Sequence, residues 1–411
     1  MNKWQEIKLG GLIDINQSSI GRNYEFENIR YYDISSIGTG VAEDPKNLSI
    51  SEAPSRAKRI IKDGDTILAT VRPGNRSFYY FKKARENDIA STGFAVISPK
   101  NNLIDNKFLY YLTSAQSFTN YLVSNEQGAT YPAITPSVIN RVKINLPPLP
   151  TQQKIAKILS NYDDLIENNL KRIKLLEESA RLTYEEWFLR FRIDGKKLDI
   201  DPESGLPFGW LNKSFGDVFN INNGYAFKSG DYAEHGVPIL RTRDYSQTKW
   251  IKIDQPIYIS EELSQKYTKY YVQEYDLMLI MVGASIGNYG VVLPNDTGLL
   301  QNQNQWAIRV NNGFEKYIFY KLLMMEDLIK NLLTKKTGAA RDFFRASFLK
   351  ELDILLPDED TVTLLNKTVQ PTFEEINNLQ HQNQLLKEAR DILLPRLMTG
   401  MIDTDELDIA I

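Results

Sequence analysis

The sequence predicts an α+β protein built as a pseudo-twofold tandem repeat. Two similar globular domains, each a curved mixed β-sheet with helices, are expected to be separated by two long antiparallel helices that form a coiled-coil spacer. Two observations lead to this prediction. A long heptad pattern follows residue 150, and the same pattern returns with its flanking segments 210 residues further along the chain.

The first long helix is expected from about Thr151 to Phe191. It follows Leu146-Pro147-Pro148-Leu149-Pro150, a run that we expect to be non-helical, and Thr151 can cap the helix N-terminus. About 40 residues rising ~1.5 Å each would make a rod near 60 Å long, which needs a partner. Its seam follows the spacing of a coiled coil: Ile155, Leu159, Tyr162, Ile166, Asn169, Ile173, Leu176, Ala180, Thr183 and Trp187.

The partner helix lies in the same chain. Adding 210 to each seam position gives a second seam: Leu365, Val369, Thr372, Ile376, Leu379, Asn383, Leu386, Arg390, Leu393 and Leu397. We expect antiparallel packing, because each helix begins at its own domain and the second domain begins where the first helix finishes. The seam asparagines Asn169 and Asn383 are open to two interpretations, a device that fixes register and a solvent-facing break in the seam.

The repeat divides the chain into six segments: 1–150, a first domain; 151–193, the first long helix; 194–209, a linker; 210–357, a second domain; 358–400, the second long helix; and 401–411, an acidic tail. In the first domain, β-like runs and turn residues predict strands at Trp4–Gly10, Arg30–Ile34, Thr66–Val71, Phe78–Phe81, Phe94–Ile97 and Val142–Leu146, with a helix at Asn106–Tyr121. The second domain repeats this pattern with strands at Asp276–Val282 and Gln305–Ile308 and a helix at Lys316–Leu333.

Composition excludes several kinds of chemistry. The chain has no cysteine and two histidines, His235 and His381, so disulfides, thiolate metal sites and a histidine cluster in each half are ruled out. No methyltransferase motif, nucleotide-binding glycine loop or apolar run of the roughly 18 residues needed to span a membrane is present. We therefore expect a cytoplasmic, non-membrane protein without catalytic residues, metal or cofactor of its own.

The charge is unevenly distributed. The net charge is −3, yet residues 1–150 carry 18 basic and 14 acidic side chains, whereas residues 358–411 carry 4 and 11. Usable positive charge therefore lies in the globular parts, and the second long helix with its tail is better suited to protein contacts or to solvent.

Several duplicated motifs carry a family resemblance. Gly128-Ala129-Thr130-Tyr131-Pro132, a strand, Leu146–Ile155 and a long helix occur in that order, and Leu206-Pro207-Phe208-Gly209-Trp210 opens the second copy. Together they resemble the specificity subunit of type I restriction–modification systems over nearly the whole chain. One feature departs from that family: the second copy has Pro357-Asp358-Glu359 where the family repeats a Pro-Pro…Gln signature.

The resemblance implies a function and a set of partners. Each domain would be a target-recognition domain that reads one half of a split double-stranded DNA site, with the paired helices setting the separation. Two methyltransferase (modification) subunits and restriction/translocase subunits would bind the chain, and AdoMet, ATP and Mg would be bound by these partners. Two alternatives stay open: a recognition subunit of a related methyltransferase–nuclease system, and a coiled-coil scaffold protein that binds no DNA.

Candidate DNA contacts in the first domain lie in two loops. Arginine can bind guanine or phosphate, and glutamine can pair with adenine. A solvated hairpin tip is the alternative for the first loop. The candidates are Arg72, Asn75, Arg76, Gln127, Thr130 and Tyr131.

The second domain has corresponding candidates: Arg241, Arg243, Ser285, Asn288, Gln301, Gln303, Arg341 and Arg345. The tract Gln301-Asn302-Gln303-Asn304-Gln305 is unusual for its run of amides. Such amides can read base edges, but the tract also fits a polar strand edge.

Overall fold

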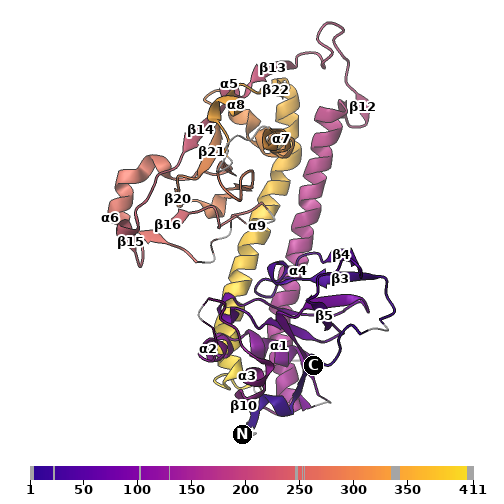
Figure 1. Cartoon of the computed structure of the whole chain (residues 1–411). Helices are drawn as coiled ribbons and strands as arrows, with labels where there is room; N and C mark the ends of the chain where they lie inside the picture. The colour runs from indigo at the N-terminus through magenta and orange to yellow at the C-terminus, as the bar shows by residue number, and fades with distance from the viewer. Residues whose placement is uncertain are drawn as a thin grey trace. The chain divides into compact units, whose positions relative to one another are not determined.

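The computed structural model describes residues 4–21, 24–100, 103–128, 130–245, 249–251, 253, 255–334 and 343–404. The chain divides into two compact units: Met1–Glu167 with Gln384–Ile411, and Asn168–Asn383. The long helices α4 (Leu149–Tyr184) and α9 (Glu359–Met398) each contribute to both units (Figure 1). The first unit contains the first globular domain, and the second unit contains the second.

The first domain is built from a two-stranded and two four-stranded sheets within its described residues. The two-stranded sheet pairs β1 (Gln5–Lys8) with β10 (Lys143–Leu146). In the first four-stranded sheet the strand order is β2 (Ile13–Ile15), β9 (Phe94–Pro99), β6 (Thr66–Ala69) and β7 (Phe78–Tyr80). In the second four-stranded sheet the strand order is β4 (Lys46–Ser49), β3 (Asn28–Tyr32), β8 (Asp88–Ser91) and β5 (Ala57–Ile60). Its helices are α1 (Asn106–Ser114), α2 (Gln116–Val123), α3 (Pro136–Asn140) and the short 3-10 helices η1 (Leu9–Gly11), η2 (Ile34–Ser36) and η3 (Pro73–Asn75).

The second domain repeats this arrangement. Its two-stranded sheet pairs β13 (Leu211–Ser214) with β22 (Asp353–Leu356). In one four-stranded sheet the strand order is β14 (Phe219–Asn223), β21 (Gln305–Val310), β18 (Leu277–Ile280) and β19 (Tyr289–Val291). In the other four-stranded sheet the strand order is β15 (Tyr232–Ala233), β17 (Tyr258–Ile259), β16 (Val237–Leu240) and β20 (Leu300–Gln301). Its helices are α5 (Phe215–Val218), α6 (Glu261–Ser264), α7 (Ile318–Leu333), α8 (Ala346–Lys350), η6 (Ser229–Asp231), η7 (Gln265–Tyr270), η8 (Pro294–Asp296) and η9 (Glu315–Tyr317).

Strand pairing confirms the predicted duplication. The strand that opens each domain pairs antiparallel with the strand before the long helix, so that Ile7 faces Ile144 in the first copy and Lys213 faces Ile354 in the second. Each domain also contains one parallel pair inside an otherwise antiparallel sheet, β3 with β8 and β16 with β20. The mixed sheet expected from the sequence is therefore present in both copies.

The heptad seam predicted for the long helices is confirmed, since all twenty seam positions are buried or half-buried. In the first unit Lys154 contacts Thr404, and Asp163, which is later in α4, contacts Arg390, which is earlier in the chain than Thr404. The two segments therefore run in opposite directions. In the second unit Asn169 contacts Asn383, and Arg172 contacts Glu375. The two helices are thus antiparallel in each unit.

Helix α4 and the helix expected at Asn106–Tyr121 differ from the expectation. Helix α4 begins at Leu149, with Pro150 in its first turn, because the first N–H groups of a helix need no partner within it. It ends in a π-helical turn, Glu185–Leu189, before a hairpin of β11 (Arg192–Ile193) and β12 (Lys196–Lys197). The helix expected at Asn106–Tyr121 is interrupted at Ala115, whose ψ of 141° is extended.

The two helix starts are fixed to their domains by different side chains. The buried Gln152 accepts a hydrogen bond from the Asp105 N–H (2.9 Å) and donates to the Pro147 carbonyl (2.9 Å). In the second copy Asp358 accepts hydrogen bonds from the Thr361 N–H (2.9 Å) and from the Trp210 indole (2.7 Å). The second helix therefore begins at a capping carboxylate, whereas the first is tied to its domain by a glutamine side chain inside the helix.

Each domain also packs against the long helices within its own unit. In the first unit, the Asp163 carboxylate on α4 accepts hydrogen bonds from Tyr111 of α1 and Arg390 of α9, both at 2.6 Å. In the second unit, the Phe188 ring lies 4.9 Å from that of Tyr320 and 5.4 Å from that of Trp210. Among the described helices, none is long and apolar enough to cross a membrane.

The buried asparagine pair on the seam yields a stability prediction. The Asn169 side-chain amide donates to the side-chain amide oxygen (Oδ1) of Asn383 at 3.1 Å, and both residues are buried. We expect Asn169→Leu to cost about 1–3 kcal/mol, because it leaves the Asn383 amide buried without its partner. Adding Asn383→Leu should recover most of that loss, since both polar groups are then gone. Urea unfolding of the four proteins measures the coupling, and purely additive effects would contradict the pairing.

Candidate nucleic-acid interface

Two loops of the first domain are joined by backbone hydrogen bonds. The Ile134 N–H donates to the Thr70 carbonyl (2.8 Å), and the Arg72 N–H donates to the Pro132 carbonyl (2.7 Å). Gln127 and Ala133 exchange two further hydrogen bonds across the second loop (2.9 and 3.0 Å). Residues 70–77 and 127–134 are here called the first loop pair. The two groups of candidate residues, which are distant in sequence, therefore lie together.

The exposed side chains of the first loop pair can present hydrogen-bonding groups outward. The guanidinium carbon of Arg72 lies 5.6 Å from the centre of the Tyr131 ring, and Tyr131 is 71% exposed. Asn75, Gln127 and Thr130 are exposed as well. An arginine resting on an aromatic face loses less freedom when it binds, so Arg72 is suited to contact a base or a phosphate.

Arg76 has a different role. Its guanidinium donates to the Ser114 carbonyl (2.8 Å) and to the Gln116 side chain, which links the loop to the region between α1 and α2. Its backbone φ of 56° and that of Arg72, 48°, are both left-handed, on either side of η3. Arg76 therefore helps to hold the shape of the loop, and its role as a DNA contact stays a prediction.

The second domain contains the same junction. The Phe344 N–H donates to the Met281 carbonyl (2.9 Å), and Val282 pairs with Phe343. These contacts correspond to those of Ile134 and Val71 in the first domain. Residues 281–288 and 343–345 are here called the second loop pair.

Arg345 is the arginine of this second loop pair. It is exposed, and its guanidinium carbon lies 5.9 Å from the Phe343 ring and 6.0 Å from the Phe348 ring. Ser285 and Asn288 are also exposed, whereas the candidate Arg341 lies outside the described residues. The sequence analysis did not single out Phe343 or Phe348. The offset of 210 that aligns the repeats could have indicated Phe343, because it places Phe343 at the position of Ala133, in the corresponding loop of the first domain.

Arg241 is a structural residue, contrary to its expected role. It forms a two-point ion pair with Asp244 (both contacts 3.2 Å) and donates to the Gln255 carbonyl, and its side chain is 13% exposed. Moving it to DNA would remove the closer of the two arginines that pair with the buried Asp244. Arg243 remains a candidate because its side chain is 55% exposed, although it also donates to Gln255 (3.2 Å).

The amide tract separates into inner and outer residues. Gln301 is 1% exposed and donates to the carbonyls of Asn222 (3.0 Å) and Gln305 (2.8 Å), so it is corrected from a DNA contact to a structural residue. Gln305 is buried and donates to the Leu240 carbonyl (2.7 Å). Gln303 is half-buried, with its amide oxygen shielded from solvent, which makes it a poor reader of bases.

The buried carboxylates of the two domains support turns. Asp65 accepts hydrogen bonds from the Lys62 N–H (2.7 Å) and the Ser98 hydroxyl (2.6 Å), and burial raises the pKa of its carboxyl. Asp276, at the same place in the repeat, accepts from the Gln273 N–H (2.8 Å) and pairs with Arg309 (2.7 and 2.8 Å). Within the described ranges, no group of three or more histidine or acidic side chains is placed to hold a metal ion.

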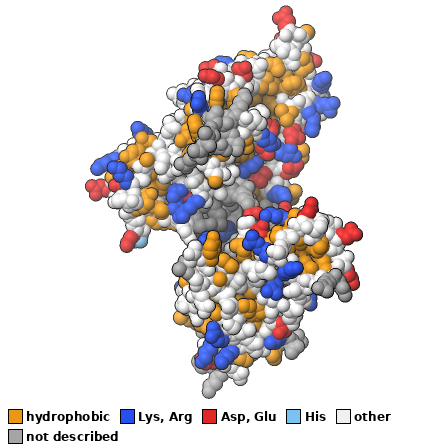
Figure 2. All heavy atoms as spheres, in the orientation of Figure 1, with side chains coloured by type: hydrophobic (Ala, Val, Ile, Leu, Met, Phe, Trp, Pro, Cys, Tyr) orange, Lys and Arg blue, Asp and Glu red, His pale blue; other side chains and the backbone are white. Residues whose placement is uncertain are grey.

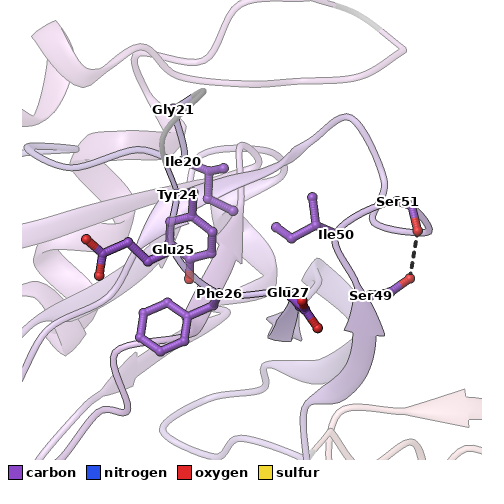
Figure 3. A pocket seen from close by; sticks show the side chains of 9 residues that line it. All are labelled: Ile20, Gly21, Tyr24, Glu25, Phe26, Glu27, Ser49, Ile50 and Ser51. Carbon is purple, nitrogen blue, oxygen red and sulfur yellow. Dashed lines mark hydrogen bonds between the residues drawn. The ribbon is translucent and has the colours of Figure 1, made fainter.

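A shallow hollow in the first domain is less suited to DNA. Its volume is about 490 Å³, and its lining includes Tyr24, Phe26 and Ile50 together with Glu25 and Glu27 (Figure 3). Carboxylates at its edge would repel phosphate. On the molecular face drawn in Figure 2, basic, acidic and hydrophobic side chains are interspersed. The loop pairs are therefore distinguished by the geometry of particular side chains.

This architecture is that of a duplicated recognition protein, and the comparison with known families agrees. The family described as "Type I restriction modification DNA specificity domain" matches residues 1–178 and 207–387, so the chain belongs to that family.

Individual relatives and one solved structure are consistent with this assignment. The type I restriction enzyme MjaIX specificity subunit of Methanocaldococcus jannaschii is 26% identical over 377 residues, covering 89% of this chain and 84% of the relative. The HindI specificity subunit of Haemophilus influenzae is 24% identical over 470 residues, covering 98% of this chain and 100% of the relative. The crystal structure of a type I restriction–modification S subunit from M. genitalium has a similar fold, with a TM-score of 0.53 over 96% of each chain at 14% identity.

The two arginines of the first loop pair should differ in their effect on stability. Arg76→Ala should lower the free energy of unfolding by about 1–3 kcal/mol, because the Ser114 carbonyl and the loop lose their partner. Arg72→Ala should change it by less than about 0.5 kcal/mol, since its side chain is exposed. Urea denaturation of both variants and the parent measures the difference. Equal losses would contradict the separation of roles.

Proposed function

We propose that this chain is the DNA sequence-specificity subunit of a type I restriction–modification complex, and that each loop pair reads one half of a split double-stranded DNA site. The observation that carries the proposal is the repeated junction. Both domains join the same two segments by equivalent backbone contacts, yet the exposed side chains differ. A constant scaffold with variable loops suits two readers of different sequences.

The chemistry of the exposed groups supports DNA as the ligand. Each loop pair carries an exposed arginine over an aromatic ring, Arg72 over Tyr131 and Arg345 over Phe343. Arginine donates two parallel hydrogen bonds to the O6 and N7 atoms of guanine, and it also binds phosphate. Exposed amides and hydroxyls beside these arginines (Asn75, Gln127, Thr130, Ser285 and Asn288) supply further donors and acceptors.

Partner subunits would bind the long helices. Leu175 and Leu182 on α4 are 70% and 45% exposed, and they are one heptad apart. The offset of 210 residues relates them to Leu385 and Ile392 on α9, which are 50% and 55% exposed. Two equivalent apolar surfaces suit two copies of one partner. We propose that these are the methyltransferase subunits, that they bind AdoMet, and that restriction subunits bind ATP and Mg, while this chain is non-catalytic.

The assignment of one reader to each half-site can be tested by mapping methylated sites. We expect Arg72→Ala and Arg345→Ala, made separately in the assembled complex, to relax recognition in different half-sites. If the arginine contacts guanine, discrimination at that base should fall by about 1–3 kcal/mol. Loss of a phosphate contact would instead weaken binding to all sequences and reduce the salt dependence.

The control for these variants is Lys143→Ala, an exposed cation on β10 that pairs with Glu6 and belongs to neither loop pair. It should leave the methylation pattern unchanged. A complex whose methylation pattern did not depend on this chain at all would favour a scaffold protein. Relaxation of both half-sites by a single variant would contradict two independent readers.

The proposed docking surfaces give a separate prediction. Leu175→Ser with Leu182→Ser should remove one of two bound methyltransferase subunits, and adding Leu385→Ser and Ile392→Ser should remove both. Native mass spectrometry of the assembled complex counts the subunits. Leu211→Ser, at a leucine 43% exposed on β13, is the matched control and should keep both. Full assembly by the quadruple variant would place the docking surface elsewhere.

A further inference from the structure

The connection between two strands lies beside each loop pair. In the first domain β8 and β9 are joined by Thr92-Gly93, and the Gly93 carbonyl accepts hydrogen bonds from the N–H (2.8 Å) and hydroxyl (2.9 Å) of Thr70. In the second domain residues 302–304 join β20 to β21, and the Asn304 carbonyl accepts from the Met281 N–H (3.2 Å). The turn 302–304 is therefore attached to the second loop pair.

The backbone of this turn is held firmly. The Gln301 side chain bridges its base by donating to the Gln305 carbonyl (2.8 Å), and the Asn302 N–H donates to the Leu240 carbonyl (3.2 Å). Gly224 approaches so closely that an added Cβ would lie 2.0 Å from the Asn302 carbonyl oxygen. Side chains on the turn are thus presented from a fixed base, which lowers the entropy cost of binding.

The two asparagines of the turn are available to a ligand. Both are half-buried, and within the part of the chain that the structure describes their side-chain amides make no hydrogen bond. The flanking Gln301 and Gln305, by contrast, are buried, and their amide nitrogens donate hydrogen bonds to backbone carbonyls. Burial therefore divides the tract into a structural clamp of glutamines and a pair of amides without protein partners.

We propose that Asn302 and Asn304 are specificity-determining residues that read adenine in the half-site of the second domain. This inference rests on the proposed function as a DNA-specificity subunit. An asparagine amide matches adenine, since it accepts a hydrogen bond from N6 and donates one to N7 in the major groove. The first domain has Thr92-Gly93 at this place and no amide, so the two domains read DNA with different elements of one scaffold.

The test uses the complete complex assembled from the full chain and its modification subunits. Methylated sites are mapped for the parent, Asn302→Ala and Asn304→Ala. We expect each variant to lose about 5- to 150-fold in discrimination at an adenine position of one half-site, the half-site relaxed by Arg345→Ala. The other half-site should be read as before. Thermal unfolding should be unchanged, because neither side chain has a partner to lose.

The control variant is Asn212→Ala, an exposed asparagine on β13, which should leave recognition intact. Unchanged recognition by both turn variants, while Arg345→Ala still relaxes a half-site, would overturn this inference and leave the proposed function standing. Relaxation at a guanine or cytosine position, or a uniform loss of binding to all sequences, would also overturn it. If no variant of either loop pair changed the methylated sequence, the proposed function would fail as well.

Discussion

The arrangement of both candidate sites depends on one repeated backbone hydrogen bond. It joins Ile134 to Thr70 in the first domain and Phe344 to Met281 in the second, with lengths of 2.8 and 2.9 Å. Because the bond uses main-chain atoms, it places no demand on the side chains of either loop. The loops can therefore change their sequence while their relative position is kept. The chain itself illustrates this freedom, since Ala133 and Thr135 in one copy correspond to Phe343 and Arg345 in the other.

At several places outside the loops, the two copies make an equivalent contact with different side chains. The first helix start is held to its domain by the Gln152 amide and the second by the Asp358 carboxylate. Likewise, the buried Asp65 carboxylate accepts a hydrogen bond from the Ser98 hydroxyl, whereas the corresponding Asp276 carboxylate accepts one from the Arg309 guanidinium. In the second copy burial lowers the pKa of Lys321 to about 8, and its amine donates to the carbonyls of Tyr275 and Ile308. The two copies therefore differ more in the side chains that make these contacts than in the backbone that the contacts support.

The sequence alone predicted the repeat and the seam, because burial along a coiled coil recurs at fixed short spacings that are visible in one chain. Positions such as Ile166 and Ile376 needed no knowledge of tertiary structure. The functional residues were harder to sort. Arg241 and Gln301 look like DNA contacts by residue type. However, Arg241 donates to the Gln255 carbonyl and Gln301 to the Asn222 carbonyl, and folding alone decides that these groups lie together. The structural contact of Arg76 could not be predicted for the same reason, since its partner Ser114 lies 38 residues away in the sequence.

A net charge of −3 limits how this protein could hold DNA. Non-specific binding grows with the number of phosphates neutralised, and a chain with a small excess of acidic groups gains little from that term by itself. Affinity would then depend on a few directed contacts and on charge brought by partner subunits. Such contacts are most effective when their side chains are already positioned. The arginines over aromatic rings and the asparagines on a clamped turn both meet that condition, and they do so in loops whose backbones are fixed by the repeated junction.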